Sequence, residues 1–251
     1  EIGVRLVGSE MCIRDRYEAE EKITVNGNVD LYAVVFNRTT ETDLTEDQLP
    51  QVDIYKYKQV IFVGDSRTEF MENVLTGMGE SATKNVKFVC SAGKGLDWFT
   101  TTGWAQLYSI VQHDSNSILS KKTAVIFNFG VNDLSKSADY AEYYNWIAPQ
   151  LKSKGCELYF MSVNPVNRLM LPNAGRADRS EAAVRSFNQY MKANLSSAYT
   201  YIDMYSYLKS TGYSFASDHY GTGTVDDGLH YTTRTYKRIF AKCMDSLRVP
   251  A

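Results

Sequence analysis

Five short, largely apolar segments alternate with longer segments of helical periodicity from residue 53 onward. Apolar runs without alternation are typical of strands that are covered on both faces, as in parallel sheets. The predicted strands are Val60–Val63, Val86–Val89, Ala124–Phe129, Leu158–Met161 and Tyr201–Ile202. Apolar residues at three- and four-residue steps predict the helices Thr68–Leu75, Tyr140–Leu151, Ser180–Leu195 and Thr233–Leu247. This alternation predicts an α/β domain with a parallel sheet and right-handed crossovers.

Composition excludes several classes of protein. The chain has 251 residues, a formal net charge of -2 and a pI near 6.0, so it lacks the basic surface that nucleic-acid binding requires. No apolar stretch of about 18 residues is present, so no membrane span is predicted. Cys90, Cys156 and Cys243 lie in apolar segments without metal-ligand spacing, and we interpret them as buried thiols. No metal and no cofactor are expected.

Residues 1–16 read EIGVRLVGSEMCIRDR, which resembles a translated sequencing adaptor. The alternative is a genuine short N-terminal segment. We exclude these residues from the fold argument and expect them to make no packing contacts. The native N-terminus would then be missing, and a signal peptide cannot be assessed.

Residues 17–38 contain two apolar runs around Asn26-Gly27, which predicts a β-hairpin. The segment NGNVDLYAVV resembles the closing strand of internalin-type B repeats of bacterial surface proteins. The alternative is an edge hairpin of the main domain. Residues 39–52 are acidic and polar, and we predict a linker there, followed by the α/β domain over residues 53–251. The repeat resemblance implies a bacterial, extracellular or cell-surface location.

Candidate functional residues lie where predicted strands end, the place where sites collect in such sheets. A serine directly after a strand sits on a sharp turn with its N–H at a helix N-terminus, and an aspartate three residues before a histidine can orient the imidazole. Each block alone is also compatible with a helix cap, a turn or a buried histidine. The blocks are Gly64-Asp65-Ser66-Arg67, Ser91–Gly95, Gly130-Val131-Asn132-Asp133 and Asp227-Gly228-Leu229-His230. The adjacent pair Asp218-His219 lacks this spacing and is set aside.

Together and in this order, the blocks resemble the SGNH hydrolase family, also called GDSL esterases and lipases, over about Tyr55 to Arg248. The resemblance implies a three-layer α/β/α fold with a five-stranded parallel sheet of flavodoxin-like topology, and no metal. It also implies that Ser66 is the nucleophile, His230 the base and Asp227 the residue that orients the base.

The same resemblance implies an oxyanion hole built from the Ser66 N–H, the Asn132 side chain and a glycine N–H of the second block. Gly95 is favoured over Gly93, because the residues after Gly95 look like the start of a helix. Arg67 departs from the family's usual leucine. It either places a cation near the site for an acidic substrate or forms a surface ion pair, and we favour the ion pair.

The sequence therefore predicts a serine esterase or deacylase that removes short acyl groups, above all O-acetyl groups, from carbohydrate or cell-wall glycan. No apolar lid is evident. Six aromatic residues in the loops are candidates for sugar platforms beside the site: Trp98, Trp104, Tyr143, Tyr144, Tyr213 and Tyr220. The alternative is that half or more of them belong to the core. Asn164 and Arg168 either line the pocket or cap loops.

Two alternatives remain open at this point. One is an O-acyltransferase on glycan, in which a second alcohol replaces water. The other is a non-catalytic carbohydrate-binding surface module, against which the presence of Ser66, Asp227 and His230 argues. The oligomeric state is not predicted.

Overall fold

The structure is a computed structural model that describes residues 4–8, 16–17, 31–35, 43–53, 56–114, 122–168, 170–171, 177–216 and 226–247. The chain divides into two compact units, Glu1–Glu41 and Thr42–Ala251.

The first unit contains a three-stranded antiparallel sheet of order β2-β1-β3, with β1 at Val4–Gly8, β2 at Arg16–Tyr17 and β3 at Leu31–Val35. The expectation that residues 1–16 make no contacts is wrong, because β1 pairs along its whole length with β3. Its sequence VRLVG contains two β-branched valines, which favour extended pairing. Strand β3 lies in the second arm of the predicted hairpin, whereas the first arm lies outside the described residues.

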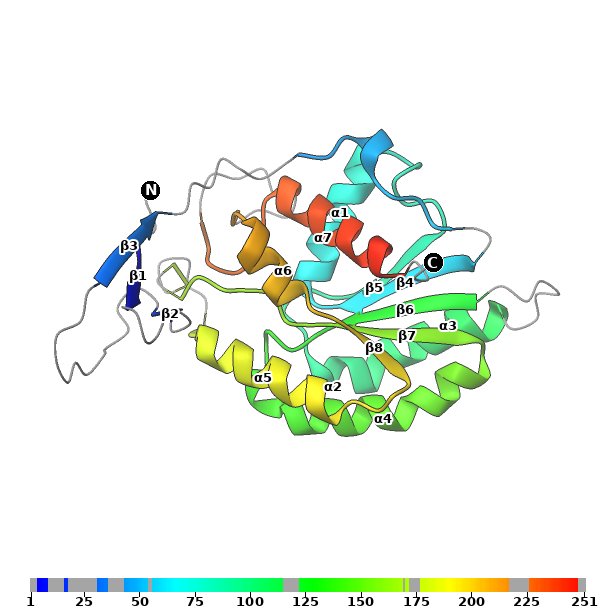
Figure 1. Ribbon diagram of the computed structural model, residues 1–251. Coiled ribbons are helices and arrows are strands. Elements are labelled where there is room, and N and C mark those ends of the chain that lie inside the picture. Colours follow the sequence, from blue (N-terminus) through cyan, green and yellow to red (C-terminus); the bar gives the residue numbers. More distant parts are fainter. Residues whose placement is uncertain are drawn as a thin grey trace. The chain divides into compact units, whose positions relative to one another are not determined.

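The second unit is built on a parallel sheet of order β5-β4-β6-β7-β8, as predicted (Figure 1). Its strands are β4 (Tyr57–Gly64), β5 (Val86–Cys90), β6 (Lys122–Asn128), β7 (Cys156–Met161) and β8 (Tyr199–Ile202). The chain leaves β4 toward β5 on one side and returns as β6 on the other. The carboxyl ends of β4 and β6 therefore mark the topological switch point, the place where ligands bind in open α/β sheets.

Helices cover both faces of the sheet and give three layers (Figure 1). The helices are α1 (Ser66–Met78), α2 (Leu96–Trp98), α3 (Trp104–Asp114), α4 (Ser137–Ser153), α5 (Glu181–Asn194), α6 (Met204–Thr211) and α7 (Thr233–Ser246), with a π-helical turn at Phe99–Gly103. Alternate strand residues point to opposite faces. Ile61 and Val63 join the cluster under α3, α4 and α5, and Val60 and Phe62 join the cluster under α1, α6 and α7.

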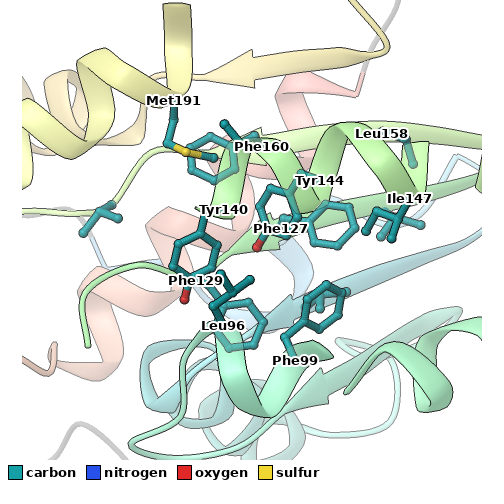
Figure 2. Close-up of a cluster of buried hydrophobic side chains, with 14 of the residues drawn as sticks. Leu96, Phe99, Phe127, Phe129, Tyr140, Tyr144, Ile147, Leu158, Phe160 and Met191 are labelled. Atoms are coloured by element: carbon teal, nitrogen blue, oxygen red, sulfur yellow. The ribbon is translucent and has the colours of Figure 1, made fainter. Parts of the chain in front are cut away.

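Aromatic rings dominate the first of these clusters (Figure 2). Phe127 on β6 lies 4.8 Å from the Tyr144 ring on α4, and the Phe99 ring lies 5.5 Å from that of Phe129, measured between centroids. All four side chains are fully buried. Such rings bury large apolar areas, so they hold α4 firmly against the sheet below the carboxyl ends of the strands.

The segment predicted as an acidic linker is partly integrated into the second unit. Leu49 and Val52 are buried with the α1, α6 and α7 cluster, and Asp43 pairs with Lys237 of α7 at 3.0 Å. The acidic and polar composition of the segment gave no indication that Leu49 and Val52 would be buried. Asp43, Leu49 and Val52 therefore attach this segment to the helices of the second unit.

Candidate active site

The turn after β4 places Ser66 at the first position of α1. Asp65 is the N-cap residue, and its carboxylate accepts a hydrogen bond from the Arg67 N–H at 3.0 Å. Such a cap satisfies one of the amide groups that a helix N-terminus leaves without a partner. Asp65 is buried, and burial raises the pKa of its carboxyl group to about 6. Ser66 thus sits at the positive end of the helix dipole.

Ser66, His230 and Asp227 form a continuous chain of hydrogen bonds. The Ser66 Oγ lies 2.9 Å from His230 Nε2, and His230 Nδ1 lies 2.7 Å from Asp227 Oδ2. The other carboxylate oxygen, Asp227 Oδ1, accepts from the N–H groups of Leu229 at 2.9 Å and His230 at 2.8 Å. The structure therefore brings together the three residues that the sequence singled out from two distant blocks.

Hydrogen bonding decides the charge of Asp227. Burial alone would raise its pKa, but the hydrogen bonds from the His230 ring and from the two backbone N–H groups lower it to about 2. The carboxylate is therefore ionised at neutral pH, and it favours the His230 tautomer that carries its proton on Nδ1. That tautomer leaves Nε2 free to accept a proton from Ser66.

The loop that carries His230 is held by a backbone contact to Asn167 and by the Phe70 ring. Gly228 has φ +72°, a conformation that side-chain-bearing residues rarely adopt, and its carbonyl accepts from the Asn167 N–H at 2.8 Å. The Phe70 ring of α1 stacks on the His230 ring with centroids 4.3 Å apart. The imidazole is thus held on one face by the Phe70 ring and at Nδ1 by Asp227.

Asn132, at the end of the turn after β6, has a fixed amide orientation. Its Nδ2 donates to the Lys94 carbonyl at 2.8 Å, and its Oδ1 accepts from Arg179 Nη2 at 3.0 Å. Arg179 also donates through Nε to the Val131 carbonyl at 2.6 Å. Because the guanidinium occupies the carbonyl side of the amide, the N–H side is turned toward the second block.

Sequence reasoning missed Arg179. It belongs to none of the four blocks and lies just before α5, where a lone arginine carries no signal.

The two glycines of the second block differ in their surroundings. Gly95 is the N-cap residue of α2, and a Cβ there would lie 2.7 Å from the Asp133 carboxyl carbon. That carboxylate in turn accepts from the Leu96 N–H at 2.9 Å. Gly93 is exposed, with φ +70° and open space where a Cβ would be. Close packing beside α2 therefore requires glycine at position 95, and the choice of Gly95 as donor stays a prediction.

The structure corrects the interpretation of Arg67, which forms no surface ion pair. Its side chain is buried and donates to three backbone carbonyls, those of Asn164, Pro165 and Leu229, at 2.8, 2.8 and 2.9 Å. It is also too enclosed to meet a substrate. The sequence could not show which loops would close over it.

Arg168, by contrast, forms an exposed bidentate pair with Asp178.

The predicted sugar-platform aromatics that the structure describes are either buried in the core or partly buried against it. Tyr144 is fully buried, and Trp98, Trp104, Tyr143 and Tyr213 pack against the two apolar clusters. Tyr220 and the pair Asp218-His219 lie outside the described residues. Among the described side chains, the large exposed hydrophobic ones are Trp146 and Tyr190. The expectation of a sugar platform is therefore wrong for Tyr144.

The cysteines of the second unit are free thiols. Cys156 and Cys243 are buried free thiols, and Cys90 is a half-buried one. Within the ranges that the structure describes, no group of three histidine, cysteine or acidic side chains is arranged to hold a metal ion. In the same ranges, no helix combines the length and the apolar character needed to cross a membrane.

Comparisons with known proteins agree with this architecture. The model of the GDSL-like lipase/acylhydrolase family matches residues 60–243. A predicted SGNH hydrolase from Slackia heliotrinireducens is structurally similar, with a TM-score of 0.53 and 12% identity over 77% of this chain and 100% of that chain. A search of curated protein sequences finds no match.

Two further solved structures show weaker similarity. An acetyl xylan esterase has a TM-score of 0.48 and 11% identity, over 76% of this chain and 100% of that chain. The catalytic domain of peptidoglycan O-acetyltransferase A from Streptococcus pneumoniae has a TM-score of 0.44 and 16% identity, over 76% and 92%. The family match covers most of the chain, and the Slackia structure has the same fold. The chain belongs to the GDSL-like lipase/acylhydrolase family and is a serine hydrolase that acts on ester bonds.

Proposed function

We propose that the protein hydrolyses short-chain acyl esters of a polar alcohol, above all O-acetyl groups on carbohydrate, with Ser66 as nucleophile, His230 as general base and Asp227 as its orienting carboxylate. The observation that carries the proposal is the unbroken chain of hydrogen bonds from Asp227 through His230 to the Ser66 hydroxyl. This arrangement is the one that nucleophilic acyl transfer needs.

In the first half of the reaction, the Ser66 hydroxyl attacks the ester carbonyl while His230 Nε2 takes its proton. Asp227 stabilises the imidazolium that forms. The negative charge on the carbonyl oxygen is met by the Ser66 N–H, by the Gly95 N–H and by the Asn132 amide. Each such donor contributes roughly 3–4 kcal/mol to the transition state. The imidazolium then gives its proton to the alcohol oxygen as the ester bond breaks. The alcohol departs, and the acyl group stays on Ser66.

In the second half, His230 removes a proton from water while the water oxygen attacks the acyl carbonyl. The bond between the acyl carbon and Ser66 Oγ then breaks, the imidazolium returns the proton to Oγ, and the acid is released. If a second alcohol attacked in place of water, the same residues would transfer the acyl group. Acid release in the presence of an added alcohol, compared with formation of the new ester, separates the two outcomes.

The polar surroundings of the site support a hydrophilic substrate. Lys94 is exposed beside Asn132, and Arg179 is half-buried on the other side of the same amide. Arg168 and Asp178 form an exposed ion pair on the loop that leads to Arg179. In the part of the chain that the structure describes, these residues offer a charged surface rather than an apolar one to an acyl chain. We therefore favour a short acyl group on a sugar alcohol. A cell-surface location stays a prediction that rests on the resemblance of residues 26–35 to internalin-type repeats.

A chain-length series tests this substrate class. We expect kcat/KM on p-nitrophenyl acetate to exceed that on the butyrate, and activity on the octanoate to be lowest, because only a short chain fits beside polar residues. Acetate release from O-acetylated xylan and from O-acetylated peptidoglycan then identifies the alcohol. A preference for octanoate would contradict the proposal and indicate a lipase.

Replacing Asn132 by alanine tests the oxyanion site. Since the amide would stabilise charge that exists only in the transition state, we expect Asn132→Ala to lower kcat by about 10²–10³-fold with little change in KM. Asn145→Ala is the matched control, because this α4 side chain also bonds through both amide atoms, to Asn194 and Ser196. A tenfold rise in KM at unchanged kcat would instead make Asn132 a ground-state contact.

A further inference from the structure

Arg67 directly follows the proposed nucleophile, and the residue is only 2% exposed. All three of its nitrogens donate to backbone carbonyls: Nε to Leu229, Nη1 to Asn164 and Nη2 to Pro165. One acceptor lies in the loop that carries His230, and the other two follow β7. A single side chain on α1 thus binds two loops at the carboxyl edge of the sheet.

The contact with Leu229 is the decisive one. Its carbonyl belongs to the same peptide group as the His230 N–H. Arg67 Nε holds the oxygen of this peptide at 2.9 Å, and Asp227 Oδ1 holds its N–H at 2.8 Å. Because hydrogen bonds in series polarise one another, a cation on the oxygen strengthens the N–H as a donor to Asp227. The peptide group before His230 is therefore held at its carbonyl oxygen by Arg67 and at its N–H by Asp227.

These contacts close a ring. The chain runs from Ser66 to Arg67 through the backbone, from Arg67 to the peptide before His230, and from the His230 ring back to Ser66 Oγ at 2.9 Å. Any shift of this peptide moves the imidazole relative to the hydroxyl. A displacement of about 1 Å in such a pair can cost about 10²-fold in rate.

The plane of the guanidinium is itself fixed. It lies over the buried Tyr231 ring, 5.0 Å from its centroid, and the Tyr231 hydroxyl donates to the Pro165 carbonyl at 2.5 Å. A planar cation over an aromatic face is the geometry that arginine supplies. Lysine could keep the charge, but it could not reach the three carbonyls with donors held in one plane.

Resting on the catalytic roles proposed above, we propose that Arg67 is a positioning residue, which fixes His230 against Ser66 by holding the Leu229–His230 peptide. The leucine usual in the family carries no donor and could not make this contact. Loss of Arg67 therefore lowers kcat while substrate binding, which Arg67 does not touch, is retained.

Arg238 provides a matched control. This α7 residue is also buried, donates to the carbonyls of Gly212 at 3.0 Å and Thr211 at 3.3 Å, and lies over the Tyr207 ring at 5.7 Å. Its acceptors lie at the end of α6. It thus reproduces the buried charge, the carbonyl contacts and the aromatic face of Arg67 without holding the peptide before the catalytic histidine.

The experiment compares the alanine and lysine variants of Arg67 and Arg238 on p-nitrophenyl acetate. We expect both Arg67 variants to lower kcat by about 10²-fold, with KM within about threefold of the wild-type value. The Arg238 variants should lower Tm by a similar amount and keep kcat. Low concentrations of guanidinium should restore part of the kcat of Arg67→Ala and leave Arg238→Ala unchanged. The far-downfield proton resonance of His230 Nδ1–H should broaden or shift only in the Arg67 variants.

Unchanged kcat in Arg67→Lys, or equal losses of kcat in the Arg67 and Arg238 variants, would overturn the inference and leave Arg67 a purely structural residue. If Arg67→Ala does not fold, the comparison of Arg67→Lys with Arg238→Lys decides by the same criterion. Ser66→Ala is assayed in parallel. Activity of Ser66→Ala would refute the proposed function itself, whereas an inactive Ser66→Ala beside fully active Arg67 variants would refute only the role of Arg67.

Discussion

Ser66→Ala is expected to abolish ester hydrolysis, with a loss in kcat on the order of 10⁶-fold. The change removes one oxygen and therefore the atom that would form the acyl-enzyme. The first turn of α1 should be unaffected, because its cap comes from Asp65. The measurement is kcat on p-nitrophenyl acetate, with Tm from thermal unfolding to show that the fold is retained.

Ser162→Ala is the matched control for this variant. Ser162 is a fully buried serine directly after β7, and its hydroxyl accepts from the Tyr205 N–H at 2.9 Å. It should cost stability and leave kcat unchanged. A sulfonyl fluoride should add one covalent group to the wild-type protein and to Ser162→Ala, and none to Ser66→Ala. More than about a tenth of wild-type activity in Ser66→Ala would show that another residue is the nucleophile.

The centre of the sheet was predictable because β4, β6 and β7 are buried on both faces. A run such as Val60–Val63 has no polar face, and the structure places it inside β4. Where the helical periodicity of apolar residues is interrupted, the sequence does not predict the helices. Neither α3 nor α6 was predicted. The π-helical turn at Phe99–Gly103 shifts the phase of apolar residues before α3, and α6 buries only Met204 and Leu208.

The sequence predicted those site residues that lie together in short local blocks. Gly64-Asp65-Ser66 and Asp227–His230 each place their functional atoms through a single turn, which a sequence pattern can show. The partners that lie across the site could not be found in this way. Arg179 reaches Asn132 from 47 positions away, and Arg67 meets Leu229 from 162 positions away. A single sequence carries no signal for such pairs, so Arg67 was placed on the surface.

Asp227→Asn should cost up to about 10⁴-fold in kcat on p-nitrophenyl acetate, with KM nearly unchanged. The physical reason lies in the two backbone donors. The N–H groups of Leu229 and His230 both require an acceptor at Oδ1, so the asparagine oxygen takes that position. The amide NH₂ then faces His230 Nδ1, which must become an acceptor. The proton moves to Nε2, and the imidazole can no longer accept the proton of Ser66.

Stability against pH gives this variant an independent readout. The pKa of Asp227 is lowered from 3.8 to about 2 in the folded protein, so the carboxylate stabilises the fold by roughly 2 kcal/mol above pH 3.8. That contribution is lost as the pH falls through 2. The Tm difference between wild type and Asp227→Asn should therefore be largest near neutral pH and shrink below pH 3.8, provided that the fold survives acid.

Asp203→Asn is the matched control, since Asp203 also caps a turn through its carboxylate, which accepts from the Ser206 N–H at 3.1 Å at the start of α6. It should keep full kcat. If Asp227→Asn lost stability as expected but kept kcat within tenfold, the carboxylate would serve the loop alone. His230 would then be oriented by the contacts of its backbone and of the Phe70 ring.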